Sequence, residues 1–254
     1  MKKQFYYFKP IIDFYVTLVC WLYYTLGFII FFAPLYLFCI LFKADKEITF
    51  QKLNYHFYRI FFRLLTFITP SLRINIDDDV KNISSSIIVS NHISYLDPLI
   101  YISIYAKHKT IVKEMFFKLP VFASVLKHSG YIPSTSHGNF SYLTIQQMEN
   151  IDIFFQKGGN LFIFPEGTRG RADSPLTFYS GAFKIARRHN IPINVVYIRD
   201  SDVLFPPGKM IFNTCIIDTI SVELLGTVYP RLEDKKRSVS DLKCQVQQLL
   251  YSQA

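Results

Sequence analysis

Cysteine and glycine are scarce in this chain, which has four cysteines and ten glycines among 254 residues. The cysteines form no C-x-x-C motif and no set spaced for zinc, so we expect buried, reduced thiols and no disulfide framework. They are Cys20, Cys39, Cys215 and Cys244. The pattern G-x-x-x-x-G-K followed by Ser or Thr is absent, and so is G-x-S-x-G, which excludes a P-loop and a nucleophile elbow.

Acidic residues are also few. The chain has 19 acidic and 28 basic residues, a formal net charge of +9 and a pI near 9.3. This balance predicts an anionic partner, such as nucleic acid, a membrane surface or a phosphorylated substrate. With 50% hydrophobic and 17% aromatic residues, the chain is too apolar for a typical nucleic-acid module. We therefore expect membrane lipids as partners and no nucleic acid.

Charged residues are missing altogether from Phe14 to Phe42. One straight helix of this stretch would be about 44 Å long, and a bilayer span takes about 20 residues. Gly27 and Pro34 interrupt it, and lysines flank both ends, which fits a hairpin that enters one leaflet and returns. A spanning helix and a monotopic hairpin both remain open. We expect residues 1–69 to form an N-terminal membrane-associated helical segment.

The last part of that segment, NYHFYRIFFRLLTFITP, has an amphipathic pattern. Arg59 and Arg63 are four residues apart and share one face of a helix, with aromatic and aliphatic residues around them. The pattern indicates either a helix packed on the domain or an interfacial helix whose arginines meet lipid phosphate.

Residues 70–254 alternate short apolar runs with helical stretches. This alternation predicts an α/β domain with a mixed, mostly parallel sheet flanked by helices. The expected strands cover residues 72–76, 85–90, 110–113, 131–133, 161–165 and 193–198. The expected helices cover residues 97–107, 120–128, 141–157, 178–189 and the chain from about 238. Sites in such sheets lie beyond the carboxyl ends of the strands.

One polar motif at a strand end is NHISYLDP, residues 91–98, which follows SSIIVS. A neutral His92 can accept a proton from a hydroxyl, and Asp97 can fix its tautomer and stabilise the imidazolium. Ser94 is a candidate third member of a triad. Because the chain lacks a nucleophile elbow, we favour a histidine that activates a hydroxyl of the substrate. Chance also produces such His and Asp pairs, so the pair alone decides nothing.

A second motif, FPEGTRG, follows the strand LFIF. Gly167 allows close backbone approach to an oxyanion, and Arg169 can bind phosphate through two hydrogen bonds. A third stretch, KEMFFKLP, begins with Lys113 at the end of another strand. Taken singly, these two stretches are by default a glycine-containing turn with a surface arginine, and a solvated lysine.

In this order, NHISYLD, KEMFFKLP followed by GYIP, FPEGTRG, and FYSGAFKIA with IPINVVYI resemble the 1-acyl-sn-glycerol-3-phosphate acyltransferase family. These enzymes, also called lysophosphatidic acid acyltransferases, belong to the wider glycerolipid acyltransferase group. The resemblance covers roughly residues 70–200 and implies the glycerolipid acyltransferase fold. The apolar front end is similar to that family's membrane-docking helices.

The resemblance implies acyl transfer from acyl-CoA or acyl carrier protein to the sn-2 hydroxyl of 1-acylglycerol-3-phosphate, which yields phosphatidic acid in phospholipid biosynthesis. His92 would be the general base and Asp97 its partner. No metal or other cofactor is implied. The catalytic domain would lie on the cytoplasmic side of the inner or plasma membrane.

The same resemblance assigns the acceptor site. Lys113 and Arg169 would hold the acceptor phosphate. Glu166 and Gly167 would shape the acceptor site together with Thr168, and Glu166 would contact the glycerol hydroxyl.

The chain departs from the family pattern at two places. After Gly130, Ser136 stands about where the family often has an arginine, and IPINVVYI has Val195 where the family often has a second proline. The first departure leaves another lysolipid, such as a lyso-aminolipid, open as the acceptor. A non-catalytic membrane lipid-binding relative is the alternative from a different functional class.

Overall fold

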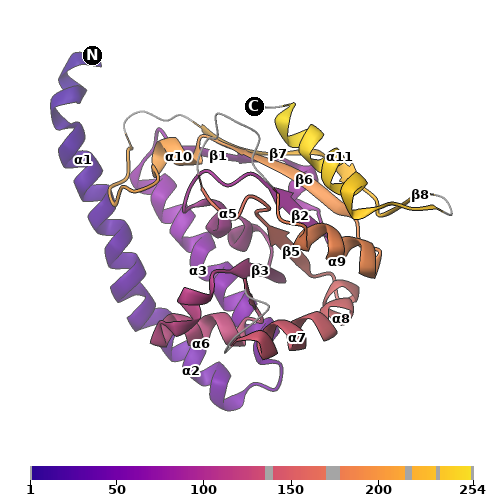
Figure 1. Ribbon diagram of the computed structural model, residues 1–254. Coiled ribbons are helices and arrows are strands. Elements are labelled where there is room, and N and C mark those ends of the chain that lie inside the picture. The colour runs from indigo at the N-terminus through magenta and orange to yellow at the C-terminus, as the bar shows by residue number, and fades with distance from the viewer. Residues whose placement is uncertain (1, 135–139, 170–177, 215–218, 233–234, 253–254) are drawn as a thin grey trace.

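The computed structural model of the chain is built around a seven-stranded sheet with helices on both faces (Figure 1). It describes residues 2–134, 140–169, 178–214, 219–232 and 235–252, with the backbone alone for residues 2–7. The α/β architecture with a helical N-terminal segment confirms the fold class expected from the sequence. The division of the chain at residue 70 stays a prediction.

The sheet has the strand order β1-β7-β6-β2-β5-β3-β4. Its strands are β1 (Arg73–Ile76), β2 (Ile87–Ser90), β3 (His108–Val112), β4 (Ile132–Pro133), β5 (Asn160–Ile163), β6 (Ile193–Arg199) and β7 (Thr219–Val228). Five neighbouring strands, from β6 to β4, are parallel, whereas β7 is antiparallel to β6. All six expected strands are present. A separate two-stranded ribbon joins β8 (Arg231–Leu232) and β9 (Lys235–Lys236).

Strand β7 was not expected, because seven of its ten residues are only partly buried and it lacks a continuous apolar run. Strand β2 shows the opposite pattern, with all four residues buried. Ile88 packs in the core on one side of the sheet, and Ile87 and Val89 pack in the core on the other. A strand that is covered on both faces is apolar throughout, which is why β2 was recognisable.

Helices cover both faces of the sheet in Figure 1. α3 (Lys46–Ile68) and α5 (Asp97–Ile104) share one core with β2 and β5, and α9 (Gly181–His189) and α11 (Val239–Tyr251) share the other. The remaining elements are α4 (Asp78–Lys81), the 3-10 helix η2 (Glu114–Lys118), α6 (Pro120–His128), α7 (Ser141–Glu149), α8 (Ile151–Gln156) and α10 (Ser201–Leu204). The five expected helices are present, although the one at 141–157 is divided at Asn150.

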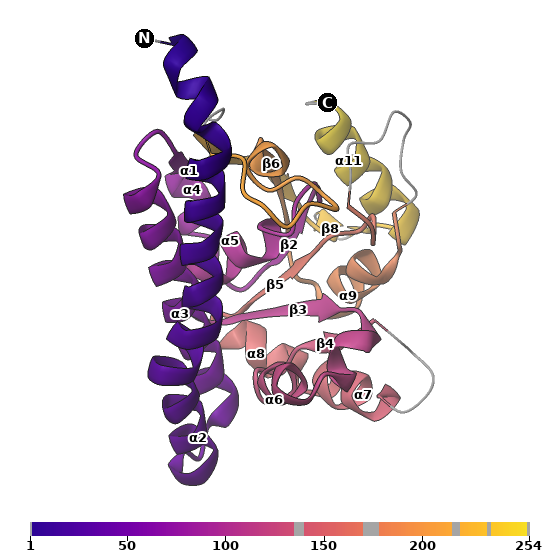
Figure 2. The same ribbon diagram turned by 90° about the vertical axis from the view of Figure 1, so that its left-hand side faces the viewer.

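The N-terminal apolar stretch forms one continuous rod in Figures 1 and 2, with no reversal between Phe14 and Phe42. Its parts are α1 (Lys2–Leu22), the π-helix η1 (Tyr23–Phe32) and α2 (Ala33–Phe42). Pro34 lies in the first turn of α2, directly after the wide π-helical turns, so its missing N–H does not end the helix. The chain reverses only before α3, where Asp45 caps the helix by accepting from the Ile48 N–H at 3.1 Å.

The rod is long and apolar enough to cross a membrane between Phe8 and Phe42, and it is the one such helix in the described part of the chain. Large apolar side chains are exposed along it, among them Phe31 at 66% and Phe42 at 69%. An exposed apolar surface of this extent indicates membrane association.

The rod packs antiparallel on α3 through aromatic side chains. Tyr23 stacks on Phe57 with ring centroids 4.8 Å apart, and Tyr36 contacts Phe50 at 4.8 Å. The apolar face of α3 is therefore buried, which agrees with the first alternative for its pattern, a helix packed on the domain. Arg59 and Arg63 are exposed. That these arginines meet lipid phosphate stays a prediction.

Of the three cysteines in the described residues, Cys20 and Cys39 are buried and Cys244 is exposed; all three are free thiols. The expectation of a buried thiol was wrong for Cys244, because it lies on the outer face of α11, whose inner face carries Leu242 and Val246. Cys215 lies outside the described residues.

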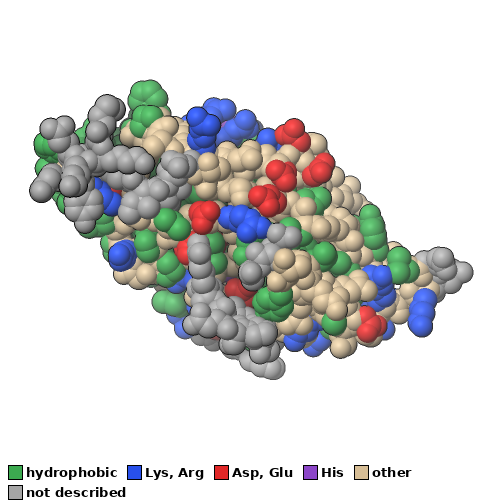
Figure 3. All heavy atoms as spheres, turned by 90° about the horizontal axis from the view of Figure 1, so that it is seen from above, with side chains coloured by type: hydrophobic (Ala, Val, Ile, Leu, Met, Phe, Trp, Pro, Cys, Tyr) green, Lys and Arg blue, Asp and Glu red, His purple; other side chains and the backbone are tan. Residues whose placement is uncertain are grey.

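On the face seen in Figure 3, basic side chains lie beside acidic ones. Several surface cations are paired with carboxylates of their own or a neighbouring element, as in Lys81–Asp78, Lys118–Glu114 and Arg199–Glu223. The described surface thus carries charges of both signs, whereas a nucleic-acid-binding protein typically has a continuous basic stripe.

Candidate active site

His92 and Asp97 lie at the carboxyl end of β2, in the turn that leads into α5. The imidazole Nδ1 is 2.9 Å from Asp97 Oδ2. Asp97 is completely buried, whereas 16% of the His92 side chain is exposed. Because the carboxylate accepts, Nδ1 carries the proton and Nε2 is the basic nitrogen.

Four hydrogen bonds orient the Asp97 carboxylate. Besides His92, the backbone N–H groups of Ile93 and Ser94 each donate to Oδ2 at 2.8 Å. The Ser201 hydroxyl donates to Oδ1 at 2.6 Å. A buried carboxylate with this many donors is held in one orientation, so it holds the imidazole as well.

The neighbouring residues of the motif have structural contacts. Asn91 spans from β2 to β6, where its side chain donates to the Ile198 carbonyl and accepts from the Ile198 N–H, both at 2.8 Å. The Ser94 hydroxyl is buried and donates to the Phe205 carbonyl at 2.9 Å. Ser94 therefore does not face a substrate, which agrees with the choice of a substrate hydroxyl as nucleophile.

The second motif reaches the same place from β5. The Phe164 ring stacks on the His92 imidazole, with centroids 4.2 Å apart and planes at 20°. Gly167 has φ +66°, and a Cβ there would lie 2.6 Å from the Tyr179 ring. The turn therefore requires glycine both for its left-handed backbone and for the close aromatic neighbour.

Glu166 lies beside the His92–Asp97 pair. Burial raises the pKa of its carboxyl to about 7, a hydrogen bond from the His92 backbone lowers it, and the charge of Asp97 raises it again. Near neutral pH this carboxyl is therefore divided between its neutral and charged forms, so it can donate a hydrogen bond as well as accept one.

Arg169 turns back toward the histidine motif. Its guanidinium carbon lies 3.3 Å from the centroid of the Tyr95 ring, a cation–π contact. Tyr95 in turn contacts Phe205, with ring centroids 6.0 Å apart. The contact with Tyr95 holds a planar cation beside the turn that carries His92.

The predicted site residues thus fall into two groups. His92, Asp97, Glu166 and Arg169 are joined by contacts of the two motifs, and Gly167 forms the turn between Glu166 and Arg169. Thr168 is exposed in the same turn. Lys113 is exposed and directly follows β3, the neighbour of β5, so it lies at the same edge of the sheet.

Three contacts of the site were not foreseen: those of Ser201, Phe164 and Tyr95. Ser201 follows the end of β6, so the rule that sites lie at carboxyl ends of strands could have indicated it. Ser136 lies outside the described residues, and Val195 is buried in β6.

Residues 71–199 match the family model described as Acyltransferase. The match covers just over half of the chain and contains all of the predicted site residues. The chain belongs to this acyltransferase family. Within the described residues, no group of three or more His, Cys, Asp or Glu side chains is arranged to hold a metal ion.

The curated relatives of this acyltransferase described next are named 1-acyl-sn-glycerol-3-phosphate acyltransferases. This chain is 28% identical over 134 residues to the chloroplastic enzyme of that name from Brassica napus. The alignment covers 51% of this chain and 38% of the relative. The 1-acyl-sn-glycerol-3-phosphate acyltransferase of Borreliella burgdorferi is 27% identical over 166 residues, 65% of each chain. The chain thus spans less than two thirds of the length of these relatives.

A solved structure shares the fold over nearly the whole chain. The 1-acyl-sn-glycerophosphate acyltransferase PlsC of Thermotoga maritima superposes with a TM-score of 0.69 and 19% identity, covering 95% of each chain. At this coverage the shared fold extends into the N-terminal rod as well as over the α/β body.

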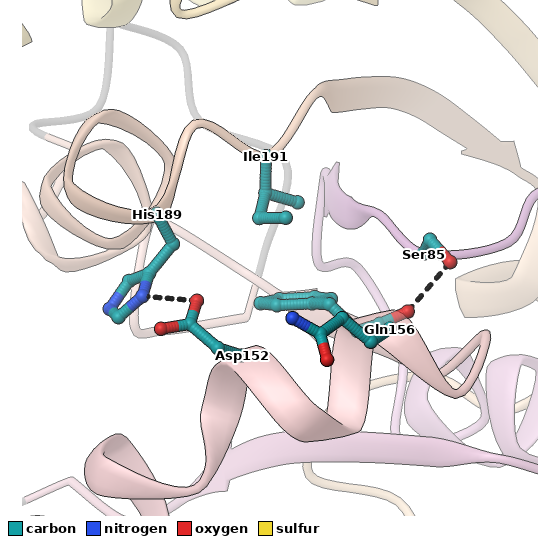
Figure 4. Close-up of a pocket in the computed structure, with 6 residues that line it drawn as sticks. Ser85, Asp152, Gln156, His189 and Ile191 are labelled. Atoms are coloured by element: carbon teal, nitrogen blue, oxygen red, sulfur yellow. Dashed lines mark hydrogen bonds and ion pairs between the residues drawn. The ribbon is translucent and has the colours of Figure 1, made fainter.

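This acyltransferase has a second His–Asp pair at the opposite edge of the sheet. His189 and Asp152 line a pocket of about 290 Å³, and their side chains point toward one another (Figure 4). The Nδ1 and Oδ1 atoms of the pair are 2.6 Å apart. Ser85 and Ile191, which line the same pocket, precede β2 and β6, so the pocket lies at the amino ends of the strands. The His189–Asp152 pair is therefore separate from the motif residues, and substitutions in it are matched controls for substitutions of His92 and Asp97.

Proposed function

We propose that the protein transfers a fatty acyl group from a thioester, acyl-CoA or acyl carrier protein, to the sn-2 hydroxyl of 1-acylglycerol-3-phosphate. The observation that carries the proposal is the His92–Asp97 pair. The buried carboxylate binds Nδ1, so the imidazole Nε2 is available as a base, and Arg169 is held nearby by its contact with Tyr95. The names of the curated relatives support the same acceptor.

The chemistry needs one base and accurate placement. His92 Nε2 takes the proton of the acceptor hydroxyl while that oxygen attacks the thioester carbonyl. Asp97 stabilises the imidazolium that forms. When the tetrahedral intermediate collapses, the carbon–sulfur bond breaks, and the imidazolium returns the proton to the departing thiolate. Because a thioester is already activated, the protein contributes mainly proton transfer and positioning.

The acceptor phosphate is assigned to Arg169 and Lys113. A guanidinium held over an aromatic ring loses little freedom when it binds phosphate through two hydrogen bonds. In its neutral form Glu166 donates to the glycerol or phosphate oxygens, whereas its charged form repels the phosphate. The proposed location of the domain is the cytoplasmic side of the membrane that holds the acceptor and product, and the exposed apolar rod supports the membrane association.

Acyl transfer by the purified full chain tests the proposal. Wild type, offered acyl-CoA or acyl carrier protein, is expected to acylate lysophosphatidic acid far better than a lysolipid that lacks a terminal phosphate, such as lysophosphatidylethanolamine. Arg169→Ala is expected to raise the KM for lysophosphatidic acid by about 10- to 100-fold, because a charge-assisted hydrogen bond contributes about 1.5–3 kcal/mol.

Arg188→Ala, an exposed arginine of α9, is the matched control and should leave that KM unchanged. Equal use of both lysolipids, with no response to Arg169→Ala, would exclude recognition of the terminal phosphate by Arg169. Activity on lysophosphatidylethanolamine alone would favour the lyso-aminolipid alternative, and no transfer to either would favour a lipid-binding relative.

The raised pKa of Glu166 predicts a pH effect. As the pH rises through about 7, the carboxyl ionises and the KM of wild type for lysophosphatidic acid should increase. Glu166→Gln stays neutral and keeps the donor, so its KM should follow only the titration of the substrate itself. Steady-state kinetics of both proteins from pH 6 to 8.5 measure the difference, and identical profiles would remove this role of Glu166.

The same carboxyl affects stability. Between the ordinary pKa of 4.5 and the folded value of about 7, the folded protein keeps a proton that the unfolded chain has lost. The free energy of unfolding of wild type should therefore fall as pH rises through this window, relative to that of Glu166→Gln.

A further inference from the structure

The two oxygens of the Asp97 carboxylate are not used alike. Oδ2 accepts from His92, Ile93 and Ser94, whereas within the described residues Oδ1 accepts only from the Ser201 hydroxyl, at 2.6 Å. Asp97 and Ser201 are both fully buried, so water does not replace this donor. The fourth hydrogen bond of the carboxylate thus comes from a residue 104 positions away in the sequence.

We infer that Ser201 is a positioning residue, which acts on acyl transfer by holding the Asp97 carboxylate in the orientation that aligns His92. The inference rests on the function proposed above. Rotation of the carboxylate about its Cβ–Cγ bond would weaken its bonds to the imidazole and to the two backbone N–H groups. A donor to Oδ1 opposes that rotation. A buried carboxylate oxygen without a donor also costs free energy.

The segment that carries Ser201 is fixed at both of its ends. Ser201 is the first residue of α10 and follows Asp200, whose φ of +61° makes the sharp turn after β6. At the other end of α10, the Phe205 N–H donates to the Ser201 carbonyl at 3.1 Å, and the Phe205 carbonyl accepts from the Ser94 hydroxyl at 2.9 Å. The helix thus contacts the histidine turn through Ser201 and again through Phe205.

The apolar rod supports this segment from the outside. On α1, the Asp13 carboxylate accepts from the Thr214 N–H at 2.8 Å and from its hydroxyl at 2.7 Å, and Thr17 accepts from the Phe212 N–H at 2.9 Å. Asn213 links this loop back to α10, since its N–H donates to the Leu204 carbonyl at 2.8 Å. Ser201 is therefore carried by an ordered segment, as a positioning residue must be.

A double-mutant cycle of Ser201→Ala with Asp97→Ala tests the inference, because alanine removes the group that Ser201 is inferred to hold. In the protein with Asp97 intact, Ser201→Ala is expected to lower kcat about 10-fold, since one hydrogen bond to a charged group is lost, and to leave both KM values unchanged. In the Asp97→Ala background the same substitution should change kcat less than twofold, because Ser201 acts through the missing carboxylate. A residue that only stabilises the fold would not show this dependence.

Ser86→Ala is the matched control, since Ser86 is buried just before the other end of β2 and donates to a backbone carbonyl. It should leave kcat unchanged in both backgrounds. Thermal unfolding verifies that each variant is folded, and Ser201→Cys, a weaker donor, takes the place of Ser201→Ala in the cycle if the latter does not fold.

Two results would overturn the inference. These are an unchanged kcat in Ser201→Ala, and an equal loss of kcat in both backgrounds. If wild type itself transfers no acyl group, the proposed function has failed. If wild type is active and His92-dependent but indifferent to Ser201, only the present inference has failed.

Discussion

His92→Ala is expected to lower kcat for acyl transfer by about 10²- to 10⁴-fold, the range that a positioned general base contributes. Without Nε2, no side chain of the pair accepts the proton of the acceptor hydroxyl, and the hydroxyl is a poor nucleophile at neutral pH. The KM for lysophosphatidic acid should change little, because the phosphate is assigned to other residues. Initial rates with saturating donor and varied acceptor measure both constants.

The fold should survive this substitution. After the imidazole is removed, Asp97 still accepts from the N–H groups of Ile93 and Ser94 and from Ser201, so its buried charge keeps three donors. The contacts that are lost are the stacking on Phe164 and the hydrogen bond to Asp97. The thermal unfolding midpoint and the cosedimentation with lipid vesicles should therefore stay close to wild type.

His189→Ala is the matched control, because it removes a histidine that is bonded to an aspartate at the other edge of the sheet (Figure 4). It should leave kcat unchanged. Turnover by His92→Ala within a few-fold of wild type, or an equal loss in His189→Ala, would contradict the assignment of His92 as the base.

Much of this fold was predictable from local patterns. Ile87 to Val89 is apolar throughout because both faces of the sheet are covered, and the polar motif after it marks the carboxyl end of the strand. The sequence left open whether the rod is one helix or a hairpin. Gly27 and Pro34 suggested a hairpin, but proline at a helix start costs no hydrogen bond. Local sequence does not show whether a helix continues through such residues, because packing on α3 helps to decide it.

The sequence could indicate Ser201 as a residue at a strand end, but not that it bonds to Asp97. Ser201 reaches Asp97 because β6 lies next to β2 in parallel register, with Ser90 opposite Val196. Arg169 lies on Tyr95 because β5 is the other neighbour of β2. Strand order and register are set by the whole sheet, so one sequence predicts the residue types at strand ends but not which of them meet.

Asp97→Asn is expected to lower kcat by about 10³-fold while the geometry of the site is kept. The two backbone N–H groups and the His92 Nδ1–H all need an acceptor, so the amide oxygen should take the place of Oδ2. The amide nitrogen then faces Ser201, whose hydroxyl can accept as well as donate. The imidazole therefore keeps its tautomer, and the negative charge is what is lost.

The magnitude follows from that charge. An imidazolium and a carboxylate about 4 Å apart attract by about 4 kcal/mol at an effective dielectric constant of about 20, which corresponds to about 10³-fold in rate. Because the charge matters chiefly once the imidazolium forms, kcat should fall and both KM values should stay near wild type. Asp152→Asn makes the same chemical change in the second His–Asp pair and should leave kcat unchanged. An unaltered kcat in Asp97→Asn would mean that the carboxylate only orients the ring, since the amide oxygen provides that orientation without the charge.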